Sequence, residues 1–173
     1  MEKECFIIKT RMEKSDYRKF LYIATFCRNK FVIPMILLIS FIGAIIYCQG
    51  IMGFHIVAVG VWTVIMFVVA MSVICFRVER RNNKRMATDA TGAFDSETTL
   101  TFYEDRVIME NECMKSKGEL TYAQFYFVLE SKEYFIFYIN ANQASLIRKK
   151  DIDNCEEFKG FLLKTFAGRY KHI

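Results

Sequence analysis

Apolar residues are gathered into one long block in the middle of this chain, with polar residues on both sides. From Phe31 to Phe76 the sequence contains 46 residues without a single Asp, Glu, Lys or Arg. A helix needs roughly 20 apolar residues to cross the hydrocarbon core of a bilayer, so the block is long enough for two crossings. The pattern therefore predicts an integral membrane protein.

The block is interrupted once, between Cys48 and His55, where two glycines and the only polar cluster occur. This interruption is typical of a tight loop, and it predicts a hairpin with helices over about 31–48 and 55–76. Pro34 falls in the first turn, where its missing N–H has no helical partner to lose. One long crossing followed by a buried soluble helix is the alternative, but a bilayer offers no partner for open backbone groups.

Positive charges at both ends of the block predict its orientation. Arg28 and Lys30 precede it, the connecting loop is uncharged, and five cations follow it. These five are Arg77, Arg80, Arg81, Lys84 and Arg85. Cationic flanks stay on the cytoplasmic side, so we expect a multi-pass protein of the plasma (inner) membrane with both termini cytoplasmic. The mostly polar residues 1–30 do not resemble a signal peptide.

The net charge of +5 suggests a nucleic-acid partner until it is divided by segment. Residues 1–30 carry +4, residues 77–97 carry +1, and residues 98–173 are neutral overall. The excess lies at the membrane boundary, where each cation attracts anionic lipid by about 1 kcal/mol. We therefore expect the bilayer and its anionic headgroups as partners, and no nucleic acid. The five cations after the block are a candidate headgroup site, although topology alone also requires them.

Short segments of alternating apolar and polar residues follow the block and predict β-strands. They are rich in Tyr, Phe, Ile and Val and are separated by polar turns. The six segments are 98–103, 107–112, 117–122, 125–130, 134–140 and 143–148. Antiparallel hairpins are the natural pairing at these loop lengths. A seventh candidate, 5–12, precedes the block and is able to return to the same sheet.

Two further segments have the period of an amphipathic helix. Residues 155–170 form one, with a capping box at its start from Asp153 or, one residue later, from Asn154. Residues 15–28 form the other, which leads directly into the first membrane helix. We expect this second helix to lie at the bilayer interface.

Several sequence segments, in the order of these elements, carry a family resemblance. Asp16-Tyr17-x-x-Phe20 lies in the first helix, and the densest segment is 122–152. There, Phe127-Val128-Leu129-Glu130-Ser131-Lys132-Glu133-Tyr134-Phe135 leads to Asn142-Gln143-Ala144 and Arg148-Lys149-Lys150. Over nearly its whole length the chain resembles the YcxB-like family of bacterial membrane proteins. The resemblance implies a cytoplasmic domain similar to pleckstrin-homology folds, with about seven strands closed by one helix, but it transfers no function.

We therefore predict an α+β membrane protein in four parts. These are a cytoplasmic strand with an interfacial helix (1–30), a transmembrane helical hairpin (31–76), a basic juxtamembrane linker (77–97), and a small cytoplasmic antiparallel β domain with a C-terminal helix (98–173). Small residues in the hairpin indicate close helix packing, either within it or between two copies as a homo-oligomer. They are Gly43, Ala44, Gly50, Gly53, Ala58 and Gly60.

Residues with catalytic or metal-binding chemistry form no recognisable pattern. The six cysteines have no C-x-x-C pair and no histidine at metal-ligand spacing, so we expect reduced thiols. His55 and His172 have no nucleophile and acid near them in the sequence, although a triad can assemble from distant positions. A carboxylate inside a membrane segment is the usual signature of an ion pathway, and the apolar block contains none. We expect no enzyme activity, no cofactor and no metal.

Two functions from different classes fit these expectations. The first is a non-enzymatic membrane protein that tethers an interaction domain and binds an unknown protein through an exposed sheet edge or aromatic surface. Its candidate binding residues are Tyr126, Phe135, Arg148, Lys149 and Lys150. The second is an immunity protein whose hairpin blocks a membrane-acting toxin or antimicrobial peptide. A third, a membrane-bound hydrolase, requires an acid, a base and a nucleophile that converge in a pocket.

Overall fold

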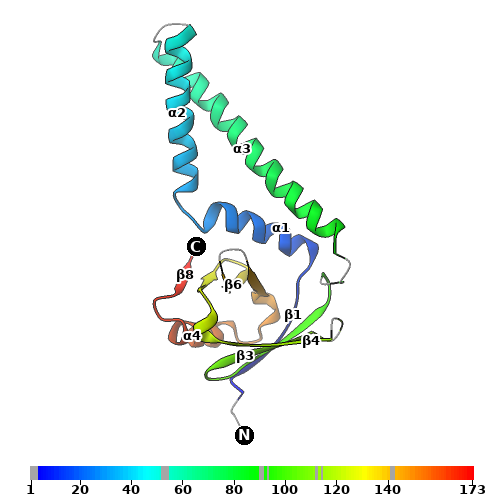
Figure 1. Cartoon of the computed structure of the whole chain (residues 1–173). Coiled ribbons are helices and arrows are strands. Elements are labelled where there is room, and N and C mark those ends of the chain that lie inside the picture. The colour runs from blue at the N-terminus through cyan, green and yellow to red at the C-terminus, as the bar shows by residue number, and fades with distance from the viewer. Residues whose placement is uncertain are drawn as a thin grey trace. The chain divides into compact units, whose positions relative to one another are not determined.

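The chain divides into two compact units, one inserted in the other. A computed structural model describes residues 4–51, 55–89, 92, 94–111, 113, 115–140 and 143–173. The β unit combines Met1–Asp16 with Asp89–Ile173, and the helical unit is Tyr17–Thr88 (Figure 1). The β unit is therefore discontinuous in sequence. Together the described residues form an α+β chain with eight strands and two long apolar helices.

The elements follow the predicted order. The β unit contains β1 (Phe6–Arg11), β2 (Glu97–Phe102), β3 (Arg106–Asn111), β4 (Ser116–Thr121), β5 (Phe127–Glu130), β6 (Tyr134–Tyr138), β7 (Ala144–Arg148), α4 (Cys155–Thr165) and β8 (Tyr170–His172). Helix α1 (Lys14–Tyr22) begins in the β unit and continues into the helical unit. The helical unit continues with a π-helical turn (Ile23–Cys27), α2 (Val32–Ile51) and α3 (Ile56–Ala87).

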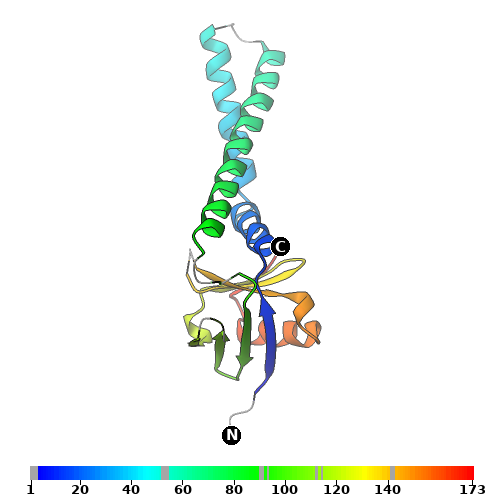
Figure 2. The same ribbon diagram turned by 90° about the vertical axis from the view of Figure 1, so that its right-hand side faces the viewer.

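The strand before the helical unit pairs with the strand after it. β1 lies antiparallel to β2, with Phe6 opposite Phe102 and Arg11 opposite Glu97. Figure 2 shows β1, in blue, beside the green strands of the same sheet. The seventh candidate strand therefore returns to the same sheet. As a result, the chain enters and leaves the helical unit from neighbouring strands.

Two four-stranded sheets form the β unit. One is antiparallel with the order β1-β2-β3-β4, and the other has the order β7-β6-β5-β8. β8 lies parallel to β5, with Leu129 opposite Lys171. The sequence pattern predicts a terminal helix to Tyr170 instead, which is wrong. α4 ends at Thr165, and Gly168, with a φ of +78°, lets the chain turn into β8.

An aromatic core combines side chains from both sheets and from α4. Its buried rings are Phe102, Tyr122, Phe125, Phe135, Phe137, Phe158 and Phe166. Phe158 lies at their centre, edge-to-face with Phe102 at 5.0 Å and with Phe135 at 5.5 Å between ring centroids. Aromatic pairs prefer this geometry, which aims a positive ring edge at a negative ring face. The core therefore joins α4 to both sheets.

Helices α2 and α3 are both long and apolar enough to cross a bilayer. They pack together next to their connection, where Ala44, Cys48 and Val59 are buried. A Cβ atom at Gly43 would lie 3.1 Å from the Sδ of Met66, so glycine permits this close approach. Away from this end the helices separate (Figure 1). The small residues of the packed region thus act within the hairpin.

Several predicted boundaries differ from those observed. Helix α2 continues through Gln49 and Gly50 to Ile51, and Gly50 and Gly60 are exposed instead of packed. Helix α3 continues from 76 to Ala87, so the first half of the predicted 77–97 linker is helical. Arg and Lys are good helix formers, and the first glycine after Phe76 comes only at position 92. Of the predicted loop, strand and turn residues, those at positions 52–54, 112, 141 and 142 lie outside the described residues.

The start of α4 also differs from the expected capping box. Asn154 is the N-cap residue, which agrees with one of the two predicted positions. Its side chain makes no cap hydrogen bond to the backbone. The Asn154 amide instead donates to the Glu157 carboxylate at 2.8 Å. The reciprocal backbone contacts of a capping box are therefore replaced by one contact between side chains.

Replacing Ile8 tests whether β1 belongs to the core of the β unit. Ile8 is 3% exposed, whereas the adjacent Ile7 is 57% exposed on the other face of the sheet. We expect Ile8→Ala to lower the free energy of unfolding by about 2–4 kcal/mol through the cavity it leaves. The control Ile7→Ala should change it by about 0.5 kcal/mol or less. Hydrogen exchange of β2 and β3 in the full chain in nanodiscs should accelerate only for Ile8→Ala, and equal exchange would contradict this packing.

Candidate functional site

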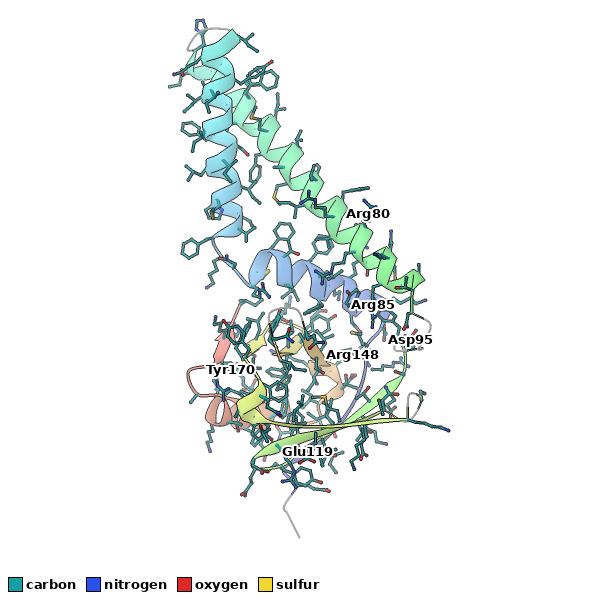
Figure 3. The ribbon with its side chains drawn as sticks, viewed as in Figure 1. Arg80, Arg85, Asp95, Glu119, Arg148 and Tyr170 are labelled. Carbon is teal, nitrogen blue, oxygen red and sulfur yellow. The ribbon has the colours of Figure 1, made fainter. Side chains whose placement is uncertain are left out.

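The five cations that follow the apolar block, predicted as a headgroup site, form one stripe on α3. Arg77, Arg80, Arg81, Lys84 and Arg85 are all exposed, and Figure 3 labels Arg80 and Arg85 on this helix. Residues three and four apart share a helix face, so their spacing brings the five side chains together. We call this group the basic stripe. Because α3 continues as a helix past Phe76, the stripe is a fixed array and not a flexible linker.

The one carboxylate within this stretch of α3 is held by α1. Glu79 Oε1 lies 2.7 Å from Arg18 Nη2 and accepts a hydrogen bond of 2.8 Å from the Tyr22 hydroxyl. Helical spacing directs Glu79 away from the basic stripe. An exposed ion pair of this kind contributes about 1 kcal/mol or less to stability. Its main consequence is that α1 and α3 are joined, and that the single carboxylate within 77–87 does not offset the charge of the stripe.

Arg148 lies inside the β unit, where it is 5% exposed (Figure 3). Its Nη1 donates to Glu13 and its Nε to Asp151, each at 2.7 Å. Asp16 lies 3.6 Å away and accepts a 2.7 Å hydrogen bond from the Tyr134 hydroxyl. Burial alone would lower the pKa of Arg148, but the Asp151 and Glu13 carboxylates outweigh it and raise that pKa. This cluster ties the segment between β1 and α1 to β6 and β7.

A second buried cluster surrounds Glu130, whose side chain is 3% exposed. Its carboxylate accepts hydrogen bonds from Lys149 at 2.6 Å and from the Tyr170 hydroxyl at 2.7 Å, and Lys159 lies 3.2 Å away. Burial alone would raise the pKa of Glu130, but these donors together lower it to about 2. The cluster connects β5 with β8, α4 and the end of β7.

The candidate partner-binding residues do not form one exposed surface. Phe135 is fully buried because both faces of β6 are covered. Arg148 and Lys149 are held in the two buried ion clusters. Tyr126, at 64% exposure, and Lys150 lie at the surface. These two residues are therefore the part of the predicted set that a partner is able to reach in the folded unit.

Sequence reasoning missed the carboxylates that hold the buried cations. It placed Glu130 at the end of the predicted strand 125–130 and Asp16 near the start of the predicted helix 15–28, and it gave Asp151 no functional role. Asp16 does accept a 3.0 Å hydrogen bond from the Glu13 N–H there, but the same side chain also accepts from Tyr134. The three-residue separation of Arg148 and Asp151 is the only local signal of these clusters. Their other contacts join residues far apart in the sequence.

The β unit has a cavity of about 220 Å³ between its two sheets. Its lining comes from Thr10, Met12, Ser96, Thr98, Leu100, Asn111, Ala144, Ser145 and Leu146. The Asn111 amide donates to Ser96 at 2.9 Å and to Thr98 at 3.0 Å. This lining is neutral and has no acid–base pair. Within the described part of the chain, no group of three His, Cys, Asp or Glu side chains is arranged to hold a metal ion.

Replacing Glu130 tests its cluster through pH. Its folded-state pKa lies below the ordinary value of 4.5, so its stabilisation is complete above that pH and is lost as pH falls toward about 2. We expect Glu130→Gln to lower the free energy of unfolding at pH 7 by about 2–4 kcal/mol, because Lys149 and Lys159 lose a buried partner. The difference from the unmodified chain should shrink below pH 4.

Urea unfolding of the full chain in detergent, followed by near-ultraviolet circular dichroism, measures this difference at each pH. Glu104→Gln is the matched control, because Glu104 is exposed. That variant should unfold like the unmodified chain at every pH. A difference for Glu130→Gln that stays constant from pH 7 to pH 2.5 would show that its carboxylate is not the stabilising group.

Comparison with known proteins identifies one part of the chain. Residues 102–162, just over a third of the sequence, match a family described as YcxB-like protein. Neither the curated proteins nor the solved structures contain a match to the chain. The matched segment runs from the end of β2 into α4 and includes both Glu130 and Arg148. The similarity to the YcxB-like family is therefore shown for this segment, which makes up more than half of the β unit.

Proposed function

We propose that this chain is a non-enzymatic membrane-anchored interaction protein. In this proposal, α2 and α3 cross the plasma membrane as a hairpin, and the β unit is a pleckstrin-homology-like domain that binds a protein partner at the cytoplasmic face. The observation that carries the proposal is the pairing of β1 with β2 on either side of the helical unit.

This pairing favours an even number of membrane crossings. β1 and β2 share backbone hydrogen bonds, so they lie on the same side of any membrane. The segment between them must then leave and return. Helix α2, with 20 residues, is about 30 Å long, which matches the hydrocarbon core. The apolar part of α3 is equally long, so the helix lengths support two crossings without reference to charge.

The side on which the β unit lies is inferred from the cations. Arg28, Lys30 and the basic stripe lie at the ends of the hairpin that connect to the β unit, whereas the connection between α2 and α3 is uncharged. Cations near membrane helices are retained in the cytoplasm. We therefore place both termini in the cytoplasm. The stripe then meets the anionic headgroups of the inner leaflet.

The β unit fits the proposed role of an interaction scaffold. Two sheets packed with a C-terminal helix resemble the pleckstrin-homology architecture, although β8 adds one strand to the expected seven. Aromatic rings fill the core, and the cavity between the sheets has a neutral lining without an acid–base pair, so we assign partner binding to the surface. Tyr126 offers an exposed ring there, and aromatic side chains are common anchors at protein interfaces.

Removing part of the basic stripe should weaken the binding of anionic lipid. We expect a triple variant to bind phosphatidylglycerol with about 3 kcal/mol less binding free energy, at about 1 kcal/mol per cation, which is roughly a hundredfold in affinity. The variant combines Arg80→Gln, Arg81→Gln and Arg85→Gln. Native mass spectrometry of the full chain, released from mixed micelles, measures how much of this lipid it retains. Replacing the exposed Lys132, Lys164 and Lys171 of the β unit is the control. An equal loss in the control would contradict a specific role for the stripe.

Photocrosslinking in native cells tests the interaction role itself. We expect a photoreactive residue at Tyr126 to capture a cytoplasmic protein, whereas the same residue at the buried Phe135 should react only within the chain. A reporter fused after Ile173 should be active in the cytoplasm. Capture only from position 55, of an extracellular peptide, would overturn the proposal and favour the immunity function. Reporter activity on the other face of the membrane would overturn the topology.

A further inference from the structure

Strand β4 forms an open edge of the antiparallel sheet. It is last in the order β1-β2-β3-β4 and pairs with β3, so no strand among the described residues lies on its other side. All residues from Ser116 to Glu119 are exposed (Figure 3 labels Glu119). An exposed strand edge carries a row of backbone N–H and C=O groups with which another strand is able to pair.

The hydrogen-bond pattern shows which backbone groups face outward. The Tyr122 N–H donates to the carbonyl of Asp105 at 3.2 Å, in the same register as β3 and β4. Bonded pairs alternate along an antiparallel ladder. Even-numbered residues of β4, such as Gly118, therefore bond to β3. Lys117 and Glu119 direct their N–H and C=O groups toward the open edge.

Thr121, the next odd-numbered residue, is consistent with this alternation. Its N–H donates to the Gln124 side chain at 2.9 Å, and not to β3. The Gln124 amide therefore occupies the edge beside Thr121. The edge remains open at Lys117 and Glu119, which lie nearer the middle of the strand.

The side chains at the open edge have opposite charges two residues apart. Lys117 and Glu119 project from the same face of the sheet, since side chains alternate along a strand. On β3, Glu110 lies 2.6 Å from Lys117, and Arg106 lies 2.9 Å from Glu119. Charges thus already alternate across β3 and β4, and a further strand with the same pattern is able to extend this alternation.

We propose that β4 pairs with β4 of a second copy of this chain, antiparallel and with Gly118 on the two-fold axis. Lys117 then lies opposite Glu119 of the second copy, and Glu119 lies opposite its Lys117. Both pairs have backbone groups that face outward, so four N–H···O bonds form across the axis. The two four-stranded sheets become one sheet of eight strands. Such a self-complementary contact is typical of a two-fold dimer.

Other registers are disfavoured by charge or by hydrogen bonding. Sliding one strand by two residues places Lys117 opposite its own copy, or Glu119 opposite its own copy, and like charges directly opposite are destabilising. Sliding by one residue sets the outward groups of one strand against the inward groups of the other. The position on the axis also tolerates a side chain within one copy, because a Cβ atom at Gly118 would meet no atom within 4 Å.

Confinement to a membrane would favour this pairing. Contact along one short strand is weak in dilute solution, but anchoring raises the effective concentration of the second copy. This step alone rests on the proposed function. The pairing itself depends only on β4. Its tests therefore measure the register of the two β4 strands, and they do not depend on membrane topology or on capture of a partner protein.

A disulfide on the axis tests the proposed register. The test uses Gly118→Cys in the full chain, with the exposed Cys27 and Cys113 replaced by serine. In the proposed dimer, the Cα atoms of the two introduced cysteines lie about 4.5 Å apart, which is within the range of a disulfide. In the control Ser116→Cys, the two copies lie about 13 Å apart along the strands, which is too far. Oxidation in native membranes should give at least about tenfold more dimer for Gly118→Cys. Equal yields, no dimer, or a disulfide to another protein would overturn the proposal.

Charge reversal tests the pairing without a new bond. Lys117→Glu and Glu119→Lys should each abolish crosslinking through Gly118→Cys, since each variant opposes like charges. A chain carrying both reversals should regain it, and so should a mixture of the two single variants, whose charges are complementary. All these positions are exposed, so hydrogen exchange in the aromatic core should be unchanged. The proposal would be overturned if the single variants gave as much crosslinked dimer as Gly118→Cys alone. It would also be overturned if the mixture of the two single variants gave none.

Discussion

The pairing of β1 with β2 is the constraint on which the rest of the structure depends. It closes a loop of 85 residues between Arg11 and Glu97, and within this loop lies the whole helical unit. Loop closure over this length costs about 2 kcal/mol more than over ten residues of flexible chain. A helical hairpin reduces the flexible length, because it returns the chain toward its starting point. The open ends of the hairpin lie apart, so α1 and the turn that joins it to α2 are also needed to close the loop between β1 and β2.

Two buried ion clusters then hold the ends of the β unit. The Arg148 cluster secures the residues that follow β1, and the Glu130 cluster secures β8 at the other end of the chain. Burying charges is expensive unless every partner is present, so these clusters add less net stability than their short distances suggest. They oppose alternative pairings, since a shifted β1 or a detached β8 would leave a charge buried without its counter-charge. We see them as devices that define which segments meet.

The sequence predicted the helices and strands better than the contacts that their side chains make. Periodicity located α2, α3 and all seven expected strands, because burial of one face, or of all faces, leaves a local pattern. It missed β8, whose three residues are too few to show a period, and it extended α4 to Tyr170, the first residue of that strand. Phe135 could not be placed correctly, because alternation marks a half-exposed strand and β6 is buried on both faces. Glu13, the carboxylate that reaches Arg148 from the other end of the β unit, was also beyond local reasoning, since it lies 135 residues away.

Charge is distributed differently in the two units, and this difference separates two kinds of attraction. The basic stripe carries five cations on one face of α3, and Glu79, the carboxylate among them in sequence, points away. Its field reaches about one Debye length, roughly 8–10 Å, so it acts on a charged surface before contact. On β3 and β4, by contrast, Lys117 and Glu119 are each already paired, and neighbouring opposite charges cancel beyond a few ångströms. Such charges select a register only when another strand is in contact. The basic stripe is thus suited to long-range attraction, and the edge of the sheet to short-range selection of a register.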